Sequence, residues 1–313
     1  MAWLRRPAEL RPNVVTSFGG FVVWAIAAAL LPAPLAARVF LLAPLVIVPR
    51  LLALLPDRGW VTRLAGWPAL LVALPLVAAF DLPTGALAGS LTLPWLAIAL
   101  VVALGAVLDG LGRVLTPGRP AAIPELGVDA ALAFWAVGAL FVVVDRLGIA
   151  TPFPTVIVLL TATHFHFAGL GLLGLASLLA RSRPWLRASV VGLIVGIPLT
   201  AVGFVLATNL VNSIGAGLVG LSGIGVGLAL LTQTTPGRWH WASRLAGAAL
   251  LISMPLAIAW SLAILTDQPF LDLDTMIRTH GELNALAVLL GIATSQAQPP
   301  RASAMDVAGI GTA

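Results

Sequence analysis

The sequence predicts an all-α polytopic transmembrane helix bundle with about ten membrane-spanning helices and both termini in the cytoplasm (N-in/C-in). Three observations predict this fold class. The 313 residues are 60% hydrophobic and 9% charged, whereas a soluble domain carries about 25% charged residues. The apolar residues form runs long enough to cross a bilayer, and the arginines gather between alternate runs. Lipid is therefore the expected solvent for most of the chain.

Ten apolar runs reach the length of a membrane span. A hydrocarbon core about 30 Å thick needs roughly 20 helical residues. Arginine, proline, glycine and aspartate separate the runs, which is typical of helix ends. The spans are expected at 13–32, 37–55, 64–80, 92–112, 124–145, 153–180, 188–209, 212–232, 241–266 and 275–296.

The arginines test this count independently. All 17 basic residues are arginine, and 14 of them fall in inner segments if the N-terminus is inside. Only Arg38, Arg146 and Arg278 fall in outer loops. Cytoplasmic loops carry an excess of basic residues, and one span too many or too few in mid-chain would invert the pattern after it. The asymmetry therefore supports the ten-span alternation.

This alternation divides the chain into three parts. We expect a cytoplasmic N-tail at 1–12, a transmembrane helical domain at 13–296 and a flexible cytoplasmic C-tail at 297–313, in a protein of the cell membrane. Its surroundings are the lipid bilayer, and the scattered arginines form no dense basic run for nucleic acid. The absence of cysteine excludes disulfides, zinc–thiolate sites and thiol catalysis.

Two segments place ionisable side chains inside predicted helices. The first, THFHFAG at 163–169, lies in the middle of the sixth span, and the second, MIRTHGELN at 276–284, opens the tenth. Ionisable groups at membrane depth cost several kcal/mol unless they are paired or hydrated, so they mark functional candidates. Both spans run from outside to inside in the predicted topology. The two segments therefore lie in the same, outer half of the membrane.

Helical geometry restricts how these residues can combine. Residues two apart on a helix point about 200° apart, so His164 and His166 do not face one ligand. His280 and Asn284 share a stripe, whereas Glu282 points elsewhere. The most economical site joins His164 to His280 and Asn284, with His166 as a second polar contact between helices. The candidate site residues are Thr163, His164, His166, His280, Glu282 and Asn284.

At these two segments the sequence resembles the YndJ-like family of bacterial multi-pass membrane proteins. The residues that carry the resemblance are 163–169 and 276–284, and the general layout of the chain is also similar. Members of the family are sometimes labelled transporters. The resemblance implies a multi-pass membrane protein in which these polar positions matter, and it implies no particular substrate or reaction.

Three functions compete at this stage. The leading one is a transporter-like protein that binds a small solute, ion or proton, because histidine titrates near neutral pH. The missing internal repeat and the apolar inner half count against it. The second is a membrane enzyme, which we favour less. Its cofactor would be a single metal ion bound by His164, His166 and His280, with Glu282 as ligand or general base, or a haem between two histidines. The third is a non-catalytic assembly or sensor protein whose histidines only hold helices together.

Overall fold

The fold is known from a computed structural model, which describes residues 12–55, 61, 63–64, 67–116, 122–233 and 239–296. Every regular element in these ranges is a helix, so the predicted all-α class is confirmed. The predicted tails at 1–12 and 297–313 lie outside the described residues, apart from Pro12.

The first half of the chain alternates long helices with short turns. Proline stands in the first turn of α7 and α8, where its missing N–H costs no helical hydrogen bond. The helices are α1 (Pro12–Leu30), α2 (Leu35–Leu42), η1 (Ala43–Ile47), α3 (Val48–Ala53), α5 (Trp67–Asp81), α6 (Ala86–Ser90), α7 (Leu93–Leu115) and α8 (Ile123–Leu147).

The second half continues the same pattern. The turn after α8 is closed by Gly148, which adopts a left-handed φ of 68° that glycine tolerates without strain. The helices are α9 (Thr155–His164), η2 (Phe165–Leu172), α10 (Leu173–Ala180), η3 (Pro184–Leu186), α11 (Arg187–Val205), α12 (Asn209–Leu231), α13 (His240–Leu265), α14 (Leu273–Met276), η5 (Ile277–Gly281) and α15 (Glu282–Gln296).

Seven of these helical stretches are long and apolar enough to cross a membrane among the described residues. Two shorter apolar helices, Ser17–Leu30 and Trp67–Asp81, coincide with the first and third expected spans. The tenth expected span is a continuous helical stretch over 273–296. It is not one of the seven, because its first half is polar. The seven are Leu35–Ala53, Ala86–Leu115, Ile123–Leu147, Thr155–Ala180, Pro184–Val205, Asn209–Leu231 and His240–Leu265.

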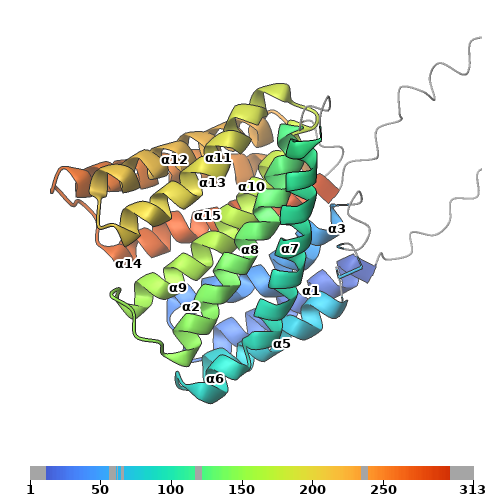
Figure 1. The fold of residues 1–313 in the computed structure, drawn as a ribbon, viewed down its shortest axis with the longest axis vertical. Helices are drawn as coiled ribbons and strands as arrows, with labels where there is room; N and C mark the ends of the chain where they lie inside the picture. Colours follow the sequence, from blue (N-terminus) through green and yellow to red (C-terminus); the bar gives the residue numbers. More distant parts are fainter. Residues whose placement is uncertain are drawn as a thin grey trace, which may run out of the picture.

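The connections between the helices alternate between two ends of the bundle (Figure 1). We call the end at which α1 begins the near end and the opposite one the far end. At the near end, Glu125 at the start of α8 pairs with Arg181 just after α10, at 2.9 Å. Asp129 in the second turn of α8 accepts a bond from Arg113 in the last turns of α7, at 3.2 Å. These pairs fix neighbouring helix ends at one level.

The far end is held by different bonds. The backbone N–H of Gly85, between α5 and α6, donates to the carbonyl of Arg146 at the end of α8, at 2.8 Å. Ser261 near the end of α13 donates to the hydroxyl of Ser213 near the start of α12, at 3.0 Å. Each contact joins a helix that ends to a helix that starts at that level, as an up-and-down bundle requires.

Three helical stretches contain π-helical turns, η1, η2 and η5. Regular α-helices were expected at these positions. A π-helical turn contains an extra residue, is rare, and is frequently found at functional sites. Two of the three, η2 and η5, coincide with the polar segments at 163–169 and 276–284.

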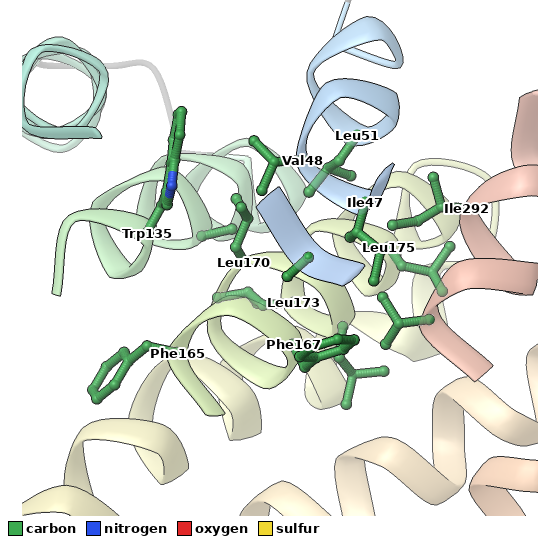
Figure 2. Packing of buried hydrophobic residues seen from close by; sticks show 14 of the residues in the cluster. Ile47, Val48, Leu51, Trp135, Phe165, Phe167, Leu170, Leu173, Leu175 and Ile292 are labelled. Carbon is green, nitrogen blue, oxygen red and sulfur yellow. The ribbon is translucent and has the colours of Figure 1, made fainter. Parts of the chain in front are cut away.

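The most buried stretch is Leu35–Ala53, in which 78% of an 18-residue window is buried. Its π-helical turn packs against the second one, where Ile47 lies beside Gly171 of η2. Glycine permits this approach, since a Cβ on Gly171 would meet Cγ1 of Val288 in α15 at 2.6 Å. Figure 2 shows Ile47 of η1, Leu175 of α10 and Ile292 of α15 close together. The two histidine-bearing helices are thus anchored to one central helix.

Candidate functional site

A group of polar side chains joins α13 to the last helical stretch that the structure describes. The hydroxyl of Ser253, in the middle of α13, donates to Oδ1 of Asn284 at 2.9 Å. The amide Nδ2 of Asn284 lies 2.9 Å from Nε2 of His280 and 3.1 Å from its Nδ1. Nδ1 of His280 lies 2.9 Å from the backbone carbonyl of Ser253. The three residues therefore form a closed ring of hydrogen bonds.

These contacts assign the proton on the imidazole of His280. A carbonyl oxygen can only accept, so Nδ1 carries the hydrogen and donates it to Ser253. Nε2 then has a lone pair and accepts from the amide of Asn284. In the neutral form of His280, every polar atom of this ring of hydrogen bonds has a partner.

The residues around His280 are half-buried or exposed. No residue of η5 is buried, although η5 lies about one turn inside the last helical stretch. Arg278 pairs with Asp274 at 2.8 Å, and their side chains are 63% and 67% exposed. Glu282 is exposed as well. The positions 274, 278 and 282 are four apart and form one charged stripe, which needs water beside it.

His164 ends α9 and is also exposed. Its Nδ1 lies 2.7 Å from the carbonyl of Leu160 in the preceding turn, and no described residue bonds its Nε2. At 1.5 Å per residue, His164 lies about 14 Å from the start of α9 and His280 lies about 10 Å from the start of α14.

His166 has a different environment. It is fully buried, its Nδ1 lies 2.8 Å from the carbonyl of Ala162, and its Nε2 accepts from the indole N–H of Trp95 at 3.1 Å. Phe40 meets its ring edge-on, with centroids 5.1 Å apart. A Cβ on Gly138 would meet its Nδ1 at 2.6 Å. His166 therefore joins α7 and α8 to η2, as a polar contact between helices.

The remaining candidates divide between the two environments. Thr163 donates back to the carbonyl of Leu159 at 2.9 Å, within its own helix. Glu282 lies on the charged stripe and not in the ring of bonds around His280. Both nitrogens of His166 are engaged, so this residue has no lone pair left for a metal ion. Among the described residues, no three of His, Cys, Asp and Glu come together as metal ligands.

Comparison with known protein families decides the relationship of the chain. A family model described as "YndJ-like protein" matches residues 38–288, more than half of the sequence. The chain belongs to the YndJ-like family. The matched range includes Ser253, His280 and Asn284, which form the ring of bonds, and the bonded pair Trp95 and His166. No curated protein and no solved structure matches the chain.

Sequence reasoning on this YndJ-like protein missed two partners. Ser253 lies in an apolar helix and is the residue that closes the ring of bonds. Trp95 lies in the first turn of α7 and donates to His166. A serine two residues before Pro255 in the middle of a span is the one signal that could have indicated the first. No signal in the sequence indicated the second.

Proposed function

We propose that the chain crosses the cell membrane ten times with both termini inside. All ten expected spans coincide with helical stretches, and the connections alternate between the two ends of the bundle. The arginine distribution then assigns the near end to the cytoplasm. The charged stripe and His280 consequently belong to the outer half of the membrane.

We further propose that the protein is transporter-like and takes up a small solute, ion or proton at an outward-facing site. The site consists of His280 and Asn284, with His164 across from them. The observation that carries the proposal is the ring of bonds around His280, because its hydrogen bonds are satisfied and yet His280 and Asn284 are only half-buried. A purely structural contact of this kind would be expected to be buried, as the one around His166 is.

The ring of bonds also gives the site a way to respond to its occupant. A proton or other donor at Nε2 of His280 removes the lone pair that accepts from Asn284. The amide of Asn284 must then rotate so that its Oδ1 faces the imidazole of His280. This rotation takes the oxygen away from the hydroxyl of Ser253. Occupancy at His280 therefore changes the contact between α13 and α15. Asp274, Arg278, Glu282 and His164 are the charged and titratable groups around it.

The accessibility of the site can be tested directly, because the natural chain has no cysteine. Single-cysteine variants His164→Cys and His280→Cys are exposed to a membrane-impermeant thiol reagent added outside intact cells. We expect both to be labelled from outside. Ala287→Cys is the matched control, since Ala287 lies in α15 and is fully buried. Labelling of the histidine positions only from inside, or of none, would contradict the proposed topology and site.

Transport itself is tested in proteoliposomes that contain a pH-sensitive dye. We expect an imposed proton gradient to drive flux through the wild-type protein, and at least tenfold less flux through His280→Ala and Asn284→Ala. His240→Ala, an exposed histidine at the near end, should keep the wild-type rate. Equal flux in all variants would argue against the site. A purified protein that holds one metal ion per chain, and loses it in His280→Ala, would favour the metal enzyme instead.

A further inference from the structure

A second site lies at the surface of the bundle, away from the histidines. A groove of about 320 Å³ runs between α7, α8 and α11. Its floor includes Ala106 and Asp129, which are 1% and 5% exposed. Its rim includes Leu111 and Val114, which are 51% and 60% exposed. The groove therefore opens sideways from the bundle, where acyl chains surround a membrane protein.

The near end of this groove is flanked by arginines. Arg113 lies three residues after Gly110, a lining residue, and so lies on the groove side of α7. Its Nε is held by the buried Asp129 at 3.2 Å, and its side chain is 36% exposed. No described residue bonds its two terminal nitrogens. The buried carboxylate thus orients the guanidinium and leaves its outer edge available.

A second arginine comes from the other wall. Arg187 is the first residue of α11 and lies seven residues before Ile194, which lines the groove. Seven residues are almost two helical turns, so the two share a face and are about 10 Å apart along the axis. Arg187 is exposed and forms no ion pair with a described residue. Two guanidinium groups therefore stand at the end of the groove where the helices leave the membrane.

We propose that this groove binds one acidic phospholipid, with an acyl chain between α7, α8 and α11 and its phosphate at Arg113 and Arg187. The apolar walls suit a hydrocarbon chain and no polar ligand. The guanidinium group matches phosphate oxygens with paired N–H donors. The arginines lie at the level of the headgroups, because α7 ends and α11 begins there. The groove and the arginines together recognise both parts of one lipid molecule.

The test uses the full chain in detergent micelles and native mass spectrometry. Phosphatidylglycerol and phosphatidylcholine of equal chain length are titrated separately. We expect phosphatidylglycerol to bind one molecule per chain at least tenfold more tightly. Arg187→Gln should remove most of that preference, and Ala133→Phe, which fills the groove, should remove the binding. Arg244→Gln changes an exposed arginine in the first turns of α13 and is the matched control.

Two outcomes would overturn the proposal. The first is equal binding of the two lipids to the wild-type protein. The second is unchanged phosphatidylglycerol binding in Ala133→Phe, provided that this variant keeps its wild-type thermal transition. Arg187 is exposed and forms no ion pair with a described residue, so Arg187→Gln should fold normally. If Ala133→Phe does not fold, the test is decided by whether Arg187→Gln loses the preference for phosphatidylglycerol.

Discussion

The bond between Trp95 and His166 gives the sharpest stability prediction. Trp95→Phe keeps a ring in a fully buried site but removes the indole N–H that donates to Nε2 at 3.1 Å. The histidine lone pair is then buried without a donor, which costs about 1–3 kcal/mol. His166→Phe leaves the indole N–H without an acceptor, at a similar cost. Each single variant should therefore unfold at a lower denaturant fraction than the wild type.

The double variant separates this bond from simple repacking. With both polar groups gone, neither is orphaned, so the double variant should cost less than the sum of the single variants. The difference should be at least about 1 kcal/mol, within the range found for hydrogen bonds between membrane helices. The assay is equilibrium unfolding of the purified protein in mixed micelles with a rising fraction of sodium dodecyl sulfate. Strictly additive costs would refute the reasoning, because they would mean that the two side chains do not interact.

Two further predictions concern packing and capping. Gly171→Ala places a Cβ at 2.6 Å from Cγ1 of Val288 and should cost about 1–3 kcal/mol by overpacking; in the same unfolding assay Gly217→Ala, which has nothing within 4 Å, should be neutral. Asp272 caps α14 by accepting from the backbone N–H of Thr275 at 2.7 Å, and this bond lowers the pKa of its carboxyl. A lowered pKa means that the cap contributes its stability above the ordinary carboxyl value of about 3.9 and loses it as the pH falls through the lowered value. The protection factor of the first amides of α14, which is their exchange rate relative to the intrinsic rate at the same pH, should therefore fall only in acid. A protection factor that does not change with pH, or that is unchanged in Asp272→Ala, would contradict the assignment.

The sequence was sufficient for features that depend on periodicity. Apolar run length gave the helices, and the four-residue spacing of His280 and Asn284 placed them on one stripe, where the structure joins them through a hydrogen bond. The same spacing argument separated His164 from His166, and the structure gives the two rings different surroundings. The shared site of His164 and His280 stays a prediction.

Features that depend on long-range contacts could not be predicted in this way. Whether His166 is buried is decided by Phe40 and Trp95, which belong to helices far away in the chain. Ser253 gains its role only because α13 and α15 pack together. Within lipid, hydrophobicity does not specify which apolar faces meet, since lipid tails are as apolar as leucine. Close contacts at small residues decide that choice instead.

The wide π-helical turns of η2 affect how α9 and α10, on either side of η2, are oriented relative to each other. A residue of a regular α-helix advances the chain by about 100° around the axis, whereas the wider i→i+5 turn of a π-helix accommodates an extra residue within one turn. Because η2 lies directly between α9 and α10, its wide turns set the orientation of His164 relative to α10. Deleting one residue within 165–172 would therefore let a wide turn close to a regular α-helical turn, and His164 would keep nearly the same orientation relative to α10.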